Sequence, residues 1–144
     1  MSSLPHLAQL DDICAFGSQT ISRSMLPVLV RRIIFQLNDS VSTLQIAGEE
    51  DTDLSGYDGI VCASHGDFFV PEGRSVWEFG TSSQSADKAE KDYEKRTADP
   101  LKEECSNTTF VFVTPHRWSK AKEWAKKKCE EGIWKEVRAY TAND

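Results

Sequence analysis

The stretch from Gly56 to Thr81 reads GYDGIVCASHGDFFVPEGRSVWEFGT and decides the fold of this 144-residue chain. Its two apolar runs, Gly59 to Ala63 and Ser75 to Phe79, flank a polar segment that contains glycine and proline, as two strands flank a connection. If the runs pair antiparallel about a turn in the middle of the stretch, Asp58 and Glu78 lie at equal distances from that turn. We therefore expect the two carboxylates side by side at one end of a hairpin.

Two carboxylates that converge on a sheet are a natural pair of oxygen ligands for a divalent cation such as Mg²⁺. We expect the turn to be centred near Phe68. Whether the two carboxylates share a face depends on the register of the strand pairing, because a slip of one residue turns every side chain to the opposite face. The alternative is that Asp58 and Glu78 are exposed charges at strand ends.

The composition predicts one globular domain over residues 1–144. The chain is 39% hydrophobic and 28% charged, and this length suffices for one substantial core. No apolar run approaches the roughly 20 residues of a membrane helix, and the N-terminus lacks the pattern of a secretory signal. The four cysteines lack C-x-x-C spacing, which indicates a reducing cytosol rather than a zinc site or a disulfide framework. We expect a cytoplasmic protein that does not bind membranes.

The net charge of −6 argues against nucleic-acid binding by the whole surface, but the charge is uneven. From Pro115 to Asp144, eight lysine and arginine residues stand against five acidic residues. The chain also stops at Asp144 directly after its last predicted strand, so we expect it to be the N-terminal part of a longer protein.

Hydrophobic periodicity and turn residues predict a mixed α/β order. The predicted helices are 6–16, 24–37, 86–96 and 119–131, the last capped by Ser119, and the predicted strands are 41–47, 59–63, 75–79, 109–114 and 137–141. Strand and helix alternate only in the second half. We therefore expect a mixed sheet, with an antiparallel hairpin followed by parallel strands and with helices on both faces.

Five segments together resemble the PD-(D/E)xK restriction-endonuclease-like superfamily over about residues 20 to 144. They are GYDG (56–59), VPEGRSVWEFGT (70–81), KAEKDYEKRT (88–97), TFVFVTPHRW (109–118) and EGIWKEVRAYTAND (131–144). Within that superfamily, the chain is most similar to the nuclease-like N-terminal effector domains of bacterial anti-phage proteins of the STAND NTPase type.

The resemblance implies a restriction-endonuclease-like sheet and a role for each motif residue. Asp58 corresponds to the metal-binding aspartate and Glu78 to the acidic member of the ExK motif, so the pair would hold Mg²⁺ or Mn²⁺. The lysine of ExK is absent, because the third position is Gly80. In this superfamily that lysine orients the attacking water and stabilises charge on the phosphate.

Two interpretations of the missing lysine remain open. We favour a lysine that has moved to the next predicted helix, where Lys88, Lys91 and Lys95 are the candidates, and we take Lys88 and Lys95 as the catalytic candidates. A lysine there would enter the space left by Gly80 and stabilise negative charge. Alternatively the site is degenerate, and these lysines only solvate a surface helix.

The basic segment after residue 115 offers contacts to a nucleic-acid backbone. Arg117 and Lys120 are its candidates for binding the phosphates of double-stranded DNA, with a salt-dependent and largely sequence-independent affinity. A solvated helix face is the alternative.

Three functions therefore compete. The first is a metal-dependent DNA endonuclease that acts as the effector domain of an anti-phage defence protein, works with the rest of a larger protein and forms homo-oligomers at full length. The second is a catalytically degenerate module for nucleic-acid binding or oligomerisation. The third is a nucleotide-handling domain of the Toll or sirtuin sort, which is disfavoured because the chain has no glycine-rich phosphate loop.

Overall fold

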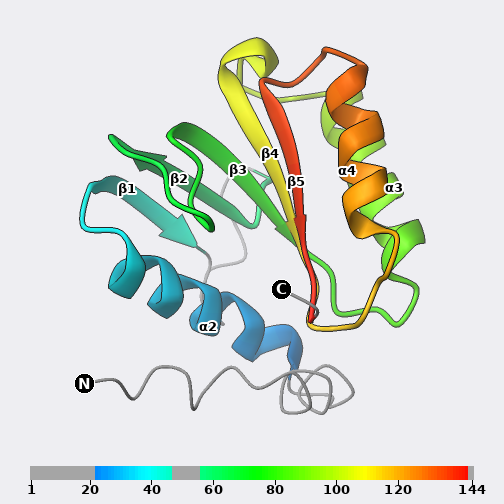
Figure 1. Cartoon of the computed structure of the whole chain (residues 1–144), viewed down its shortest axis with the longest axis horizontal. Helices are drawn as coiled ribbons and strands as arrows, with labels where there is room; N and C mark the ends of the chain where they lie inside the picture. Colours follow the sequence, from blue (N-terminus) through cyan, green and yellow to red (C-terminus); the bar gives the residue numbers. More distant parts are fainter. Residues whose placement is uncertain (1–21, 47–55, 143–144) are drawn as a thin grey trace.

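A five-stranded sheet with the order β1-β2-β3-β4-β5 lies at the centre of the molecule (Figure 1). The structure is a computed structural model that describes residues 22–46 and 56–142. Its elements are α2 (Ser22–Leu37), β1 (Val41–Ile46), β2 (Gly59–Ala63), β3 (Gly73–Phe79), α3 (Ser85–Ala98), the 3₁₀ turn η2 (Cys105–Asn107), β4 (Thr108–Val113), α4 (Ala121–Glu130) and β5 (Glu136–Tyr140). The helix predicted over 6–16 lies outside the described residues.

The sheet is mixed, as the sequence predicts. β1 pairs with β2 and β2 with β3 in the antiparallel sense, whereas β3 pairs with β4 and β4 with β5 in the parallel sense. The predicted α/β fold, with an antiparallel hairpin that leads into parallel strands, is therefore confirmed.

The central hairpin has the register that the sequence predicts. Gly59 of β2 lies opposite Trp77 of β3. Asp58 directly precedes Gly59, and Glu78 directly follows Trp77, so the next position along the hairpin brings Asp58 and Glu78 together. Residues opposite each other on neighbouring strands share a face of the sheet. The two carboxylates therefore belong to one face and one end of the hairpin.

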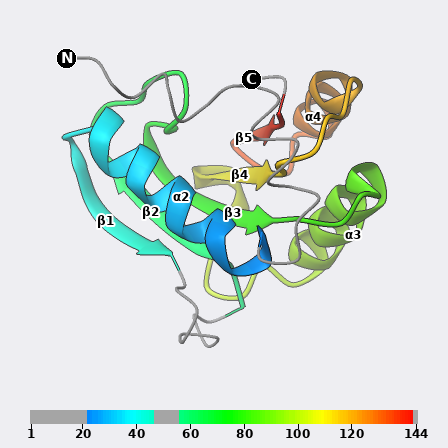
Figure 2. The ribbon, with the colours of Figure 1, turned by 90° about the horizontal axis from the view of Figure 1, so that it is seen from below.

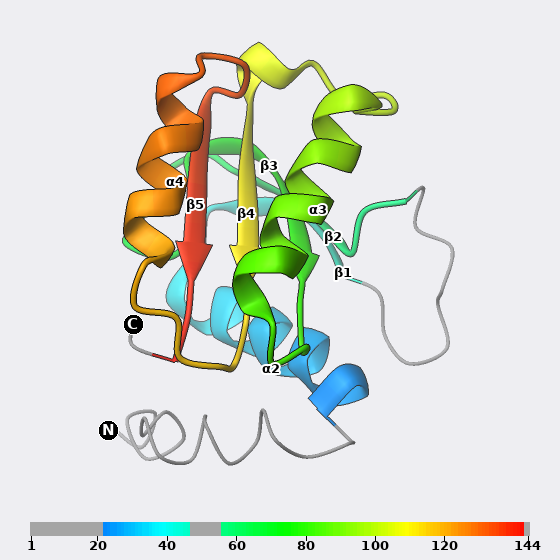
Figure 3. The same ribbon diagram turned by 90° about the vertical axis from the view of Figure 1, so that its right-hand side faces the viewer.

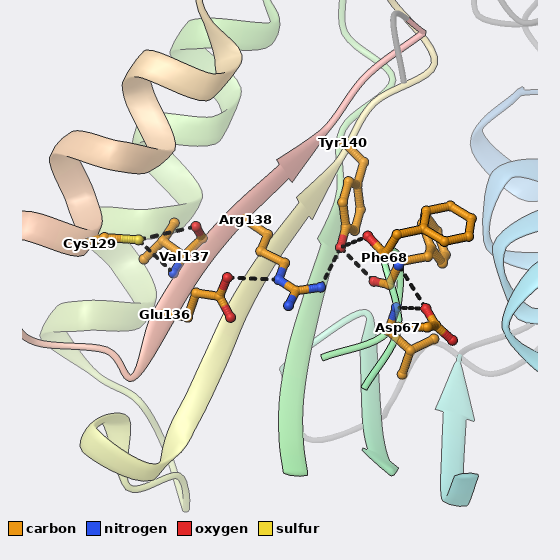
Figure 4. Close-up of polar contacts among 9 residues, drawn as sticks. Asp67, Phe68, Cys129, Glu136, Val137, Arg138 and Tyr140 are labelled. Carbon is orange, nitrogen blue, oxygen red and sulfur yellow. Dashed lines mark hydrogen bonds and ion pairs between the residues drawn. The ribbon is translucent and has the colours of Figure 1, made fainter. Parts of the chain in front are cut away.

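The connection between β2 and β3 is fixed by side-chain hydrogen bonds (Figure 4). Asp67 Oδ1 accepts hydrogen bonds from the backbone N–H groups of Phe69 and Val70, both at 2.7 Å. Tyr140, the last residue of β5, donates its hydroxyl proton to the carbonyl of Phe69 and accepts a hydrogen bond of 3.0 Å from Arg138 Nη1. An ordered connection of this kind holds the register of the hairpin.

Helix α2 covers one face of the sheet (Figure 2). Leu26, Val30 and Ile34 recur every four residues and form the buried stripe of the helix. They belong to one core cluster with Trp77 and Val111 of the sheet. Full burial of each such side chain contributes roughly 1.5–3 kcal/mol. Trp77, which the sequence assigns to the core, is fully buried.

Helices α3 and α4 cover the opposite face (Figure 3). Tyr93 of α3 and Ala125 of α4 pack with Phe110 and Phe112 of β4 in a second core cluster. The ring of Tyr93 meets Phe110 edge-on, with centroids 5.6 Å apart. Glu78 alternates with Trp77 along β3, so its side chain lies on this second face, beneath α3.

The start of α4 differs from the prediction. The helix begins at Ala121, and Lys120 precedes it without a capping hydrogen bond from its side chain. The predicted cap, Ser119, therefore lies one residue before the cap position that the structure gives. Among the helices of residues 22–46 and 56–142, none combines the length and the apolar composition needed to cross a membrane.

Candidate active site

Asp58 and Glu78, which we call the acidic pair, are joined by two hydrogen bonds at the end of the hairpin. The backbone N–H of Asp58 donates to Glu78 Oε2 at 3.1 Å. The backbone N–H of Phe79, the last residue of β3, donates to Asp58 Oδ2 at 2.8 Å. Each carboxylate therefore accepts a hydrogen bond from the backbone on the opposite side of the hairpin. The structure brings together the two residues that the sequence predicts as a pair.

Burial makes the acidic pair unfavourable in its fully ionised form. Glu78 is only 4% exposed, and Asp58 is half-buried. Burial and then the negative charge of Asp58 raise the pKa of Glu78 to about 7, against the opposing effect of Arg96. Burial also raises the pKa of Asp58, although the hydrogen bond from Phe79 works in the opposite direction. A nearby positive charge would favour the ionised form of both groups.

Arg96 of α3 supplies one positive charge directly to Glu78. Its Nε donates to Glu78 Oε1 at 3.1 Å, its Nη2 donates to the carbonyl of Gly56, and its guanidinium carbon lies 4.8 Å from the centre of the Tyr57 ring. Arg96 is 7% exposed. Sequence reasoning missed this residue, although its spacing of four from Asp92 and eight from Lys88 places all three on one helix face.

Lys88 is the lysine that the structure places beside the acidic pair. A Cβ atom at Gly80 would lie 2.8 Å from Lys88 Cγ, so the stem of Lys88 occupies the space over Gly80. The positive charge of Lys88 also lowers the pKa of Asp58. Lys91 and Lys95 are exposed to solvent, and neither is among the charges that shift the pKa values of the acidic pair.

Asp92 is a third acidic residue that the sequence analysis did not single out. It is 7% exposed, and its Oδ1 accepts a hydrogen bond from Lys88 Nζ at 2.9 Å. Its negative charge raises the pKa of both members of the acidic pair. The i, i+4 spacing from Lys88 was the signal available in the sequence. We call Lys88, Asp92 and Arg96 the α3 stripe.

Arg117 and Lys120 lie on the connection between β4 and α4, and both are exposed. This connection leaves the sheet at the same end as the acidic pair (Figure 3). The end is closed by a hydrogen bond from Gly80 N–H to the carbonyl of Val113, at 2.9 Å, and by a contact of 2.7 Å between His116 Nε2 and the carbonyl of Thr81. These two basic residues therefore lie at the same end of the sheet as the acidic pair.

The chemistry of the donor set suits a hard divalent cation. Asp58 and Glu78 place carboxylates at adjacent positions of neighbouring strands, and Mg²⁺ is commonly bound by one or two carboxylates with several waters. Among the described residues, no group of three or more histidine, cysteine, aspartate and glutamate side chains is placed to hold a metal ion directly. A cation here would therefore take two carboxylates from the protein.

The chain matches no protein-family model, no curated protein and no solved structure.

Proposed function

We propose that this chain is a metal-dependent DNA endonuclease domain of the PD-(D/E)xK type. One observation carries the proposal: a buried and a half-buried carboxylate meet at the end of a hairpin, and the stem of Lys88 lies over Gly80, the position where the motif lacks its lysine. The expected substrate is double-stranded DNA, and the expected cofactor is Mg²⁺ or Mn²⁺.

The acidic pair would hold the cation. When bound, such a cation polarises the phosphate and lowers the pKa of water that attacks it. The raised pKa of Glu78, about 7, fits this role, because a carboxylate that is costly to ionise alone gains most from a neighbouring positive charge.

Lys88 would stabilise the negative charge that develops on the phosphate during cleavage. Its ammonium group is held by Asp92 at 2.9 Å, and its stem is held over Gly80. A lysine fixed before the substrate arrives needs no rearrangement during the reaction, and such preorganised charges are typically worth 10²- to 10³-fold in rate.

Arg117 and Lys120 would bind the DNA backbone. Both are exposed beside the end of the sheet that carries the acidic pair. Contacts from such residues to phosphates position the duplex without reading its sequence, and they weaken as the salt concentration rises.

The wider biological role follows from the resemblance in the sequence. We propose that the domain is the effector of a bacterial anti-phage defence protein, with a larger multidomain chain, such as a STAND-type NTPase, as its natural context. Assembly of several copies by that larger chain would supply a DNA-binding surface that one acidic domain lacks.

One observation favours a second function, a catalytically degenerate module for nucleic-acid binding or oligomerisation. Arg96 already forms a buried ion pair with Glu78 at 3.1 Å. A site of this kind can be stable without a metal ion, since a well-bonded buried pair satisfies both charges.

Incubation of the full-length protein with supercoiled plasmid and Mg²⁺ or Mn²⁺ tests the proposal. Wild-type protein should cut the plasmid, Asp58→Asn and Glu78→Gln should not, and chelation of the metal should stop the reaction. Asp87→Asn, an exposed aspartate in the first turn of α3, is the matched control and should cut normally. Full cleavage by either variant of the acidic pair would contradict the assignment, whereas DNA binding without cleavage by wild type would support the degenerate module.

A further inference from the structure

Asp92 holds one carboxylate oxygen that has no partner. Oδ1 is bonded to Lys88 Nζ, but Oδ2 is buried and makes no hydrogen bond within the described part of the protein. The side chain is about nine-tenths buried. An unbonded buried oxygen of a carboxylate loses its hydration without compensation. Asp92 Oδ2 can therefore accept a hydrogen bond from one further donor.

The charges around Asp92 indicate what kind of ligand brings that donor. Asp92 lies on α3 one turn from Arg96, which bonds Glu78 at 3.1 Å, and one turn from Lys88, whose stem lies over Gly80. This geometry places Asp92 on the helix face that meets the acidic pair. The acidic pair and Asp92 carry three negative charges when ionised, and the α3 stripe offers only two positive charges, those of Lys88 and Arg96. Buried charges are normally paired or bind metals. A cation with bound water satisfies both the charge and the missing donor.

We propose that Asp92 is a third acidic residue of the cation site, and that its Oδ2 accepts a hydrogen bond from a hydration water of a divalent cation held by the acidic pair. The inference rests on the proposed function and deepens it. A contact through water agrees with the absence, among residues 22–46 and 56–142, of three groups placed to hold a metal directly. It also agrees with the coordination of Mg²⁺ in proteins, where the ion usually retains several water ligands.

A titration of the 144-residue chain with Mn²⁺ alone tests this role, with free Mn²⁺ measured by electron paramagnetic resonance. Asp92→Asn keeps the shape of the side chain and removes its charge. We expect it to weaken Mn²⁺ binding by at least about 10-fold, the usual loss when a residue that supports a metal site from the next layer is changed. Asp87→Asn should bind Mn²⁺ as wild type does, and Asp58→Asn should lose binding.

A second pair of variants separates a direct role of Asp92 from a role through Lys88. Lys88→Met removes the ammonium group that Asp92 holds. If Asp92 acts on the cation itself, the double variant Lys88→Met with Asp92→Asn should bind Mn²⁺ at least about 10-fold more weakly than Lys88→Met alone. The double variant removes both members of the ion pair, so it also serves if Asp92→Asn alone does not fold.

The outcomes are distinct. Weaker binding by Asp92→Asn in both backgrounds supports the inference. Unchanged binding by Asp92→Asn, with loss in Asp58→Asn, overturns the inference and leaves the proposed function standing. Equal binding by Lys88→Met and the double variant also overturns it, because Asp92 would then only position Lys88. A wild-type chain that binds no Mn²⁺ overturns both the inference and the metal-dependent function.

Discussion

Glu78 has a bonded partner for each carboxylate oxygen and is still difficult to ionise. Arg96 Nε bonds Oε1, and the N–H of Asp58 bonds Oε2. Burial and the charge of Asp58 outweigh these contacts, so the pKa rises to about 7. Near pH 7, Glu78 is therefore protonated in part of the molecules and ionised in the rest. A carboxylate in this condition releases its proton readily when a cation arrives.

This raised pKa predicts that the metal-free protein loses stability as the pH rises from about 5 to about 8. The pKa of Glu78 is about 7 in the folded chain and 4.5 in its ordinary state, so the folded form holds the proton more tightly. The resulting stabilisation is complete below the ordinary pKa and disappears as the pH passes the folded value. Each unit of difference corresponds to about 1.4 kcal/mol, which gives a loss of a few kcal/mol.

Urea unfolding in the presence of a chelator, at pH 5, 6, 7 and 8, checks this prediction. The comparison is with Glu78→Gln, which lacks the titrating group, so the difference between the two proteins isolates Glu78 from other groups. That difference in unfolding free energy should fall with rising pH. A difference that is flat or increases with pH would show that Glu78 does not hold its proton more tightly in the folded chain.

At the scale of the element, the α3 stripe predicts that DNA cleavage depends on Lys88 and does not depend on Lys91 or Lys95. Lys88→Met keeps the apolar stem and removes the charge beside the acidic pair, so DNA cleavage should fall by roughly 10²- to 10³-fold. Lys91→Met and Lys95→Met are matched controls on the exposed side of the same helix. Plasmid cleavage rates in Mg²⁺ measure the effect. Normal cleavage by Lys88→Met would remove the migrated lysine from the proposed mechanism.

Arg96 links α3 to the hairpin, and its loss should destabilise the fold. Arg96→Met leaves Glu78 and the Gly56 carbonyl without their buried partner, and breaking a buried ion pair from one side costs about 3–5 kcal/mol. Lys95→Met, one position earlier and exposed, should change the unfolding free energy by no more than about 0.5 kcal/mol. Urea unfolding at pH 8, where Glu78 is ionised, compares the two. Equal stability of the two variants would mean that Arg96 does not support the hairpin.

The hairpin could be predicted from sequence because its geometry is local. The positions of Asp58 and Glu78 depend only on the pairing of two short runs about one turn, and the observed pairing of Gly59 with Trp77 is centred on residue 68, as the sequence predicts. The α3 stripe could not be predicted in the same way. Helix α3 is charged on most of its surface, and the face that meets Glu78 is set by how Ala89 and Tyr93 pack in the core. The spacing of Lys88, Asp92 and Arg96 groups them on one face of the helix, but the sequence does not show that this face is the one that meets Glu78.

For the whole molecule, we predict that the 144-residue chain cuts DNA weakly by itself. Its net charge is −6, so long-range electrostatics oppose its approach to DNA. Fusion to a scaffold that assembles several copies should raise the cleavage rate per domain at physiological salt, since linked copies bind the same duplex with high effective concentration. The control is the same fusion with Asp58→Asn. Vigorous plasmid degradation by the monomeric chain at physiological salt would contradict the need for assembly.

The side chain of Lys88 fills the space beside Gly80, and this limits which residues related chains can carry at these two positions. A Cβ atom at Gly80 would lie 2.5 Å from Phe112 Cζ and 2.8 Å from Lys88 Cγ, and Phe112 is fixed in the core. A lysine at position 80 would therefore require the Phe112 ring and the stem of Lys88 to move. We therefore expect relatives of this chain that carry a lysine at position 80 to differ at position 88 or at position 112.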